Sequence, residues 1–316
     1  MVSVPNAASV PSPTPSGDGW LCTGLHWTDG HPTLVAVDGE REHLRVLTPG
    51  HHLALSWTGP RRCVGWWAPG TGRTPCPDGA QIGPSATLAQ CTFCQNRDHG
   101  LAIARDRIVD DGRTYQLYLA WFAPGMLKIG ITAELRGDAR LLEQGAIGYT
   151  VIATGTLPAA RRAELTVSGT GLAKERYRAS AKVEAWWQLP DPTGLQAGLQ
   201  HGRTKALRIL ADHDLATFPD GPIVDNHAFF GLEDGAPPTY QQIDALADPG
   251  ALTVTPGRTI GKNIFLTTPA YSHPLLLDLR LLAGRTIAAA AAETPCSGLR
   301  FVERRRPVQY DMEALF

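Results

Sequence analysis

The chain has 316 residues, of which 43% are hydrophobic and 19% charged, and its formal net charge is −1. This length predicts two or three domains with a large core, and the near-neutral charge excludes a protein whose whole surface is basic for DNA binding. No stretch approaches 18 apolar residues, so we expect no membrane-spanning helix, and residues 1–18 read as a disordered tail and not as a signal peptide.

Residues 19–60 contain short apolar runs that Gly, Pro and Asp separate at intervals of roughly ten residues. This spacing predicts a small antiparallel sheet with strands at 33–37, 43–47 and 53–57. Residues 61–100 are rich in Cys, Gly and Pro and show little apolar periodicity. Such a segment cannot build a core of its own, so we expect a cross-link to stabilise it.

Residues 101–215 alternate between strand-like and helix-like patterns. A hairpin is predicted at 114–132, where two apolar runs flank an Ala-Pro-Gly turn. The elements predicted after it are a helix at 135–144, a strand at 149–157, a helix from Pro158 to about residue 167, a helix at 172–187 and a helix at 204–215. The whole chain therefore predicts an α/β (α+β) fold.

The last segment, residues 216–316, returns to strands and turns. Its clearest runs lie at 252–255, 263–267 and 275–280, whereas the five alanines at 288–292 favour neither helix nor strand. We expect this segment to pack with residues 19–60 as one β-rich domain, into which the mixed core is inserted.

Four of the six cysteines form a C-x12-C-x14-C-x2-C pattern: Cys63, Cys76, Cys91 and Cys94. Zinc favours four tetrahedral thiolates, so the pattern predicts a structural Zn²⁺ site. The alternatives are a set in which His99 replaces one cysteine, a redox C-x-x-C pair, and unrelated buried cysteines. Clustered cysteines without a secretion signal indicate a reducing compartment, so we expect a cytoplasmic protein.

The second strand of the predicted hairpin ends in the letters KIGIT. Tyr118 lies in the first strand, Gly130 in the second, Arg140 follows Gly130 by ten residues, and Glu164 follows Arg140 by 24. This order of residues resembles the GIY-YIG endonuclease fold, with QLY and KIG at the two motif strands. KIGIT, EQGA at 143–146 and R-x-x-E at 161–164 also resemble an uncharacterised prokaryotic family that pairs an upstream cysteine cluster with such a core, over roughly residues 60–190.

The resemblance implies cleavage of a phosphodiester in DNA or RNA with one divalent cation. In that reading Glu164 would hold Mg²⁺ or Mn²⁺, Arg140 would bind the phosphate through two hydrogen bonds, and Tyr118 would act as the general base. Gly130 would let a phosphate approach the backbone closely.

The residues around Glu164 are basic. Residues 158–182 contain six basic and two acidic side chains, a net charge of +4. Arg161 and Arg162 are the phosphate-binding candidates in this stretch, and a solvated helix surface is the alternative.

The chain departs from the motif at two positions, because Gln116 replaces the first glycine and Lys128 replaces the second tyrosine. Lys128 is itself a site candidate that would bind phosphate or act as the base, or it marks a loss of hydrolysis. Tyr115 is an alternative phenol, but Tyr115 and Tyr118 point to opposite sides of a regular strand. A nucleic-acid-binding protein without catalysis and an accessory enzyme acting on a small molecule are therefore the alternative functions.

Overall fold

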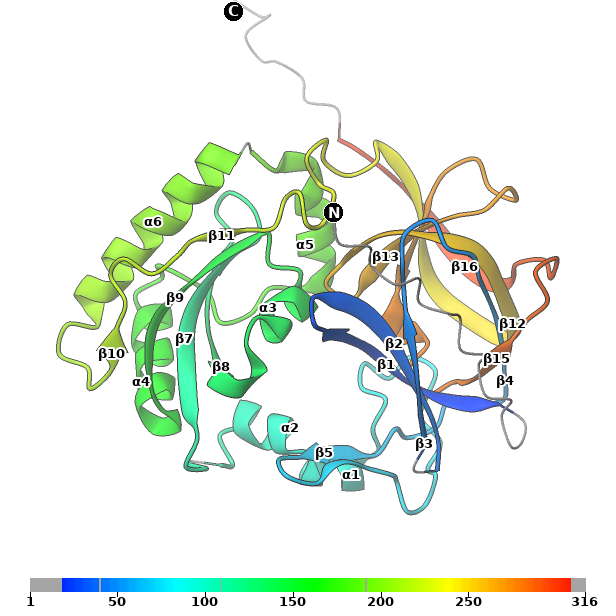
Figure 1. Ribbon diagram of the computed structural model, residues 1–316, viewed down its shortest axis with the longest axis horizontal. Helices are drawn as coiled ribbons and strands as arrows, with labels where there is room; N and C mark the ends of the chain where they lie inside the picture. The colour runs from blue at the N-terminus through cyan, green and yellow to red at the C-terminus, as the bar shows by residue number, and fades with distance from the viewer. Residues whose placement is uncertain (1–18, 40, 109, 191, 308–316) are drawn as a thin grey trace, which may run out of the picture.

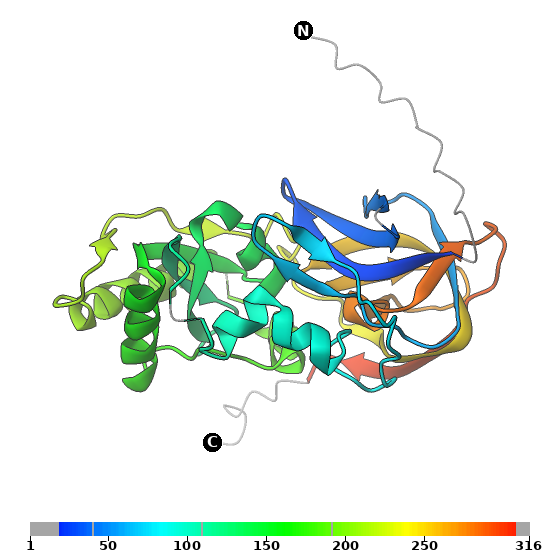
Figure 2. The same cartoon turned by 90° about the horizontal axis from the view of Figure 1, so that it is seen from below.

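The computed structural model describes residues 19–39, 41–108, 110–190 and 192–307, so the expected tail lies outside the described residues. It is a mixed α+β structure, in which the described strands form three sheets. A β-rich part built from both ends of the chain lies beside a mixed part built from the middle (Figures 1 and 2). The cysteine-bearing segment contacts both.

The β-rich part is one sheet of nine described strands. They are β1 (Trp20–Thr28), β2 (His31–Asp38), β3 (Arg41–Val46), β4 (Leu53–Thr58), β12 (Thr239–Ile260), β13 (Asn263–Thr267), β14 (Leu275–Asp278), β15 (Thr286–Ala289) and β16 (Ser297–Arg305). Their order is β13-β14-β12-β4-β15-β1-β2-β3, with β16 paired to β12. All pairs are antiparallel except β12 with β14.

Strands from the two ends of the chain interleave at the centre of this sheet, where β4 lies between β12 and β15. On β4, Trp57 pairs with Gly250 of β12 on one side and with Ile287 of β15 on the other. The inward-facing apolar side chains of both ends, such as Leu25 and Leu252, form one buried cluster. Burial of this alternating apolar face is what holds the two ends together.

The mixed part is a five-stranded antiparallel sheet in the described residues. Its strands are β7 (Thr114–Trp121), β8 (Leu127–Ala133), β9 (Gly148–Thr156), β10 (Ala216–Thr217) and β11 (Val224–Asp225). The order is β10-β9-β7-β8, with β11 also on β9. One face, carrying Leu117 and Leu119, packs against α4 (Leu157–Gly169) and α6 (Pro192–Ile209). The other face carries Tyr118 and packs against α3 (Ala139–Gln144).

Two predicted helices are shorter than the pattern indicated. The helix predicted at 135–144 is broken at Gly137, where φ is 47°, into the 3-10 turn η1 (Glu134–Arg136) and α3. In the helix predicted at 172–187, only α5 (Ala179–Ala185) and η2 (Trp186–Gln188) are helical. The preceding residues follow the outer edge of β8 instead, because the Ile129 amide donates to the Lys174 carbonyl and the Lys174 amide to that of Leu127.

The helix predicted at 204–215 was placed too late, since α6 begins at Pro192 and ends at Ile209. Glycines in the part of α6 before residue 204 lower helix propensity, and the sequence pattern therefore did not indicate that the helix begins at Pro192. They have a packing role here: a β-carbon at Gly202 would lie 2.6 Å from Leu127 Cδ2, and one at Gly198 would lie 3.2 Å from Trp121 Nε1. The run predicted at 275–280 ends as a strand at Asp278 and continues as η3 (Leu279–Leu281).

The cysteine-bearing segment contains the two-stranded sheet β5 (Trp66–Ala68) and β6 (Gly72–Thr74), then α1 (Thr92–Arg97) and α2 (His99–Ala104). The buried Arg61 guanidinium fixes its start to the β-rich part, because it donates to the carbonyls of Ala283, Gly83, Pro84 and Ala86. This one side chain therefore satisfies several loop carbonyls that would otherwise lose their hydrogen bonds to water.

A charged network fixes the other end of the segment to β7. Asp111 Oδ2 lies 2.9 Å from His99 Nε2 and accepts hydrogen bonds from Arg113 Nη2 at 2.6 Å and Tyr115 Oη at 2.7 Å. Burial favours the neutral carboxyl, but these hydrogen bonds outweigh it and hold the pKa of Asp111 well below its usual range. Tyr115 is thus committed to this network, on the opposite side of β7 from Tyr118.

Candidate functional site

Tyr118, Lys128 and Gly130 lie together on the α3-facing side of the sheet. Tyr118 and Gly130 are cross-strand partners on β7 and β8, and Lys128 precedes Gly130 by two residues and so shares its face. A β-carbon at Gly130 would lie 2.5 Å from Tyr118 Oη and 2.6 Å from Lys128 Nζ. The hydroxyl and the ammonium therefore occupy the space above the glycine. We call this surface the Tyr118 face.

Gln144, the last residue of α3, connects this face to a second lysine. Its side-chain amide donates to Tyr118 Oη at 2.9 Å, and its carbonyl accepts from Lys182 Nζ at 3.0 Å. The Lys182 ammonium lies 3.6 Å from the centre of the Phe122 ring. Burial, and then the positive charges of Lys128 and other cations, lower the pKa of Lys182 to about 7.

A third lysine reaches this region from the β-rich part. Gly145 after α3 and Gly261 in the β12–β13 turn approach so closely that a β-carbon at Gly261 would lie 2.9 Å from the Gly145 amide nitrogen. This contact brings Lys262 toward α3, where burial lowers its pKa and Glu143 opposes that shift. Three of the chain's five lysines thus lie near α3. This grouping was not predictable from the sequence, because Lys182 and Lys262 are far from the hairpin along the chain.

Arg140 lies on α3, as the predicted order of elements requires, but its side chain turns to Glu143. The Arg140 side chain is 45% exposed, and its Nη1 lies 3.8 Å from Glu143 Oε2. Its link to the Tyr118 face runs through its carbonyl, which accepts a hydrogen bond from Gln144 Nε2 at 3.2 Å. The arginine is therefore near the face without contacting Tyr118 in the structure.

Glu164 is buried on α4, with 5% of its surface exposed, and forms an ion pair with Arg161. Burial raises the pKa of Glu164, and the positive charges of Arg161 and Lys128 oppose that shift. Arg161 also binds Asp106 at 2.9 Å and Glu175 at 3.3 Å. Arg161 is thus neutralised by acids, whereas Arg162 is exposed on the outside of α4.

The four predicted cysteines converge in a separate cluster, formed by Cys63, Cys76, Cys91 and Cys94, whose Sγ atoms all lie within 4.8 Å of one another. Cys63 Sγ accepts hydrogen bonds from the amides of Cys91 at 3.2 Å and Gly65 at 3.4 Å. Such N–H donors stabilise negative charge on sulfur, so the cluster could hold a metal such as zinc. His99 belongs to the Asp111 network, and Cys22 and Cys296 lie in the β-rich part.

The thiols of this cluster differ in their surroundings. Burial raises the pKa of Cys94 and of Cys63. Burial acts in the same direction on Cys76, but hydrogen bonds from the backbone of Ala80 and Asp78 and from the neighbouring cysteines lower its pKa to about 7. A thiolate at neutral pH is the form that binds metal.

The comparisons with known proteins give one match. Residues 50–174 match a family described as a protein of unknown function (DUF2797). No curated protein and no solved structure matches the chain. The DUF2797 region contains both the cysteine cluster and the Tyr118 face, together with Arg140 and Glu164. Among the described helices, none has the length and apolar character needed to cross a bilayer.

Proposed function

We propose that the Tyr118 face binds a phosphodiester of DNA or RNA and cleaves it by hydrolysis with one divalent cation. The observation that carries this proposal is the meeting of the Tyr118 hydroxyl and the Lys128 ammonium above Gly130. A hydroxyl and an ammonium side by side suit the oxygens of a phosphate, whose charge increases in the transition state. The hairpin β7–β8 followed by α3, β9 and α4 also supports it, because the GIY-YIG resemblance implies this order.

The residues around Tyr118 suit a proton transfer at its oxygen. Gln144 donates to Tyr118 Oη, and the Lys128 ammonium lies beside it, so both stabilise negative charge there. Tyr118 would accept a proton from the attacking water, and Arg140 would bind the phosphate after its side chain turns away from Glu143. The β7 and α3 backbones hold Tyr118 and Gln144 in place before substrate arrives.

Glu164 fits a divalent cation by its chemistry. Mg²⁺ is commonly held by one or two carboxylates, substrate phosphate and water, and the ion pair with Arg161 engages Oε2 of Glu164. Mg²⁺ or Mn²⁺ at this carboxylate would neutralise the phosphate and stabilise the leaving oxygen. Arg161 would have to release Glu164, and Asp106 and Glu175 remain as partners for it.

Binding without cleavage is the second candidate, and two observations favour it. Glu164 is already neutralised by Arg161, and Tyr118 is only 1% exposed. If that ion pair persists, Lys128 still supplies positive charge for a phosphate, but no cation is recruited. The protein would then be a nucleic-acid-binding protein with a zinc-stabilised segment.

Cleavage and binding assays on the purified chain separate these functions. We expect the chain to nick plasmid DNA or cut a structured RNA with Mg²⁺ or Mn²⁺, and Glu164→Gln to slow cleavage at least about 100-fold. Glu303→Gln is the matched control, because this carboxylate lies in an exposed pair with Arg305 on β16. Cleavage that persists in Glu164→Gln contradicts the catalytic role.

Binding is measured with a fluorescent oligonucleotide at several salt concentrations. Lys128→Gln should weaken binding and reduce the salt slope by about one, because one phosphate contact is lost. Salt-sensitive binding by a chain that cleaves nothing selects the second candidate. A wild-type chain that binds neither DNA nor RNA rejects both.

A further inference from the structure

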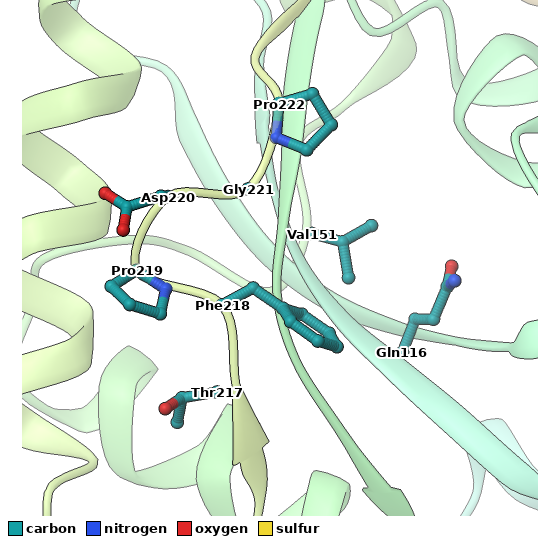
Figure 3. Close-up of a pocket in the computed structure, with 8 residues that line it drawn as sticks. All are labelled: Gln116, Val151, Thr217, Phe218, Pro219, Asp220, Gly221 and Pro222. Atoms are coloured by element: carbon teal, nitrogen blue, oxygen red, sulfur yellow. The ribbon is translucent and has the colours of Figure 1, made fainter.

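A cavity of about 500 Å³ adjoins the Tyr118 face. It is lined by Gln116, Val151 and the loop 217–222 (Figure 3). Val151 is the cross-strand partner of Tyr118 on β9, and Gln116 precedes Tyr118 by two residues on β7. Both side chains therefore lie on the same side of the sheet as Tyr118, and Gln116 is roughly 7 Å along the strand from it.

The lining combines one aromatic ring, apolar surface and an amide. Phe218 is 38% exposed although its ring is large and apolar. Figure 3 shows this ring on the same side of the loop as Val151 and Gln116, whereas the Asp220 carboxylate points away from them. A flat ring beside an amide that both donates and accepts hydrogen bonds suits a nucleobase. None of the described residues that line the cavity is basic, so a phosphate is a poor occupant.

The loop that carries Phe218 is fixed to the sheet. The Phe218 amide donates to the Ile152 carbonyl at 2.8 Å. The Gly221 carbonyl accepts a hydrogen bond from Arg203, whose side chain is buried on α6. A β-carbon at Gly221 would lie 2.9 Å from the Val151 carbonyl oxygen, so the loop lies tightly against β9. A loop backbone held in this way loses little conformational entropy when a ligand stacks on the ring that it carries.

We propose that this cavity is a nucleobase subsite, and that it takes the base of a nucleotide whose phosphate lies at the Tyr118 face. The inference rests on the proposed function and defines its substrate class. Bases in a duplex are stacked and paired, so only a base of a single strand or one turned out of its helix can enter. The preferred substrate is therefore single-stranded nucleic acid or an unpaired site.

The probe is a short single-stranded oligonucleotide that contains 2-aminopurine, whose fluorescence falls when the base stacks on a ring. We expect quenching on the wild-type protein. Phe218→Ala should remove the quenching and weaken binding about 5- to 100-fold, the usual effect of losing one base–aromatic stack. The salt slope should stay unchanged because no phosphate contact is lost. Phe218→Trp should restore both quenching and affinity.

Phe229→Ala is the matched control, because Phe229 is also an exposed phenylalanine but packs beside Trp27 and Phe230, outside the cavity. It should leave quenching and affinity unchanged. Equal binding and quenching by wild type and Phe218→Ala, with Lys128→Gln still reducing the salt slope, would overturn the base subsite and leave the proposed function standing. Absence of any oligonucleotide binding would reject both.

Discussion

The Tyr118 hydroxyl lies 2.5 Å from the position that a β-carbon would occupy at Gly130 on the neighbouring strand. Glycine is required here for space, because the phenol and the Lys128 ammonium already fill the volume above its α-carbon. β8 cannot easily move away, since its other edge is hydrogen-bonded to Lys174.

We predict that Gly130→Ala lowers the free energy of unfolding by about 1–3 kcal/mol, the usual cost of overpacking a buried site. Urea denaturation measures this change. Gly169→Ala is the control, because a β-carbon there meets no atom within 4 Å, and it should be neutral or slightly stabilising. Equal effects of the two variants would contradict the crowded geometry above Gly130.

The cysteine cluster predicts about one zinc ion per chain. Cys91→Ser should remove that zinc and expose the segment around the cluster to proteolysis, because few apolar contacts hold it. Metal analysis and limited trypsin digestion measure the two effects. The Cys296→Ser variant should still bind the zinc, since Cys296 lies in the β-rich part, where its thiol donates a hydrogen bond to the Thr253 carbonyl. Full zinc content in Cys91→Ser would reject the assignment.

Asp111 should stabilise the junction between the cysteine segment and β7. We predict that Asp111→Asn lowers the free energy of unfolding by about 1.5–3 kcal/mol at pH 7, the usual range for a charged hydrogen bond. The exposed pair Arg305–Glu303 offers a control, and Glu303→Gln should change stability by less than about 1 kcal/mol.

The dependence of stability on acidic pH tests the same residue, Asp111. The pKa of Asp111 is depressed from its ordinary value of 3.8, so its stabilisation is complete above that value and declines as the pH falls below it. The stability difference between wild type and Asp111→Asn should therefore shrink between pH 5 and pH 2, measured by thermal unfolding. A difference that grows on acidification would contradict the network.

Lys182 should make the stability of the folded chain depend on pH in the alkaline range. Its pKa is about 7 in the folded chain and 10.5 ordinarily, so above pH 7 the unfolded chain binds a proton that the folded chain does not. Stability from this group should rise between pH 7 and 10, by at most about 1.4 kcal/mol per pH unit. Lys182→Met should reduce the measured rise, leaving the part that comes from the buried Lys262, whereas Lys205→Met, which alters an exposed lysine on α6, should keep it in full.

The sequence predicted several strands because their apolar runs and turn residues are local signals, but it did not indicate β1 or β16. The hairpin at Thr114–Trp121 and Leu127–Ala133 and the strand Asn263–Thr267 lie where the pattern indicated. The helices were harder. Residues 192–203 of α6 were missed because Gly198 and Gly202 reduce helix propensity, and their use in packing against Trp121 and Leu127 depends on tertiary structure.

The residues of the candidate site also fall into a predictable and an unpredictable group. Tyr118, Lys128 and Gly130 were predictable because they belong to one hairpin. The surroundings of these residues were not predictable: Gln144 donates to Tyr118 from the end of a short helix, and Lys262 approaches α3 from the β-rich part through the Gly145–Gly261 contact. The ion pair between Glu164 and Arg161 was also not predictable, because R-x-x-E spacing on a helix does not by itself show that the two side chains bind each other.

The position of β4 has a consequence for how the chain folds during synthesis. Both neighbours of Trp57, Gly250 and Ile287, leave the ribosome only after the whole mixed part has been made. The inserted part can reach its fold first, whereas β4 must wait with both edges unpaired, and such edges favour aggregation. Closure of the β-rich sheet is therefore expected to be the slow step, since it joins the most distant segments of the chain.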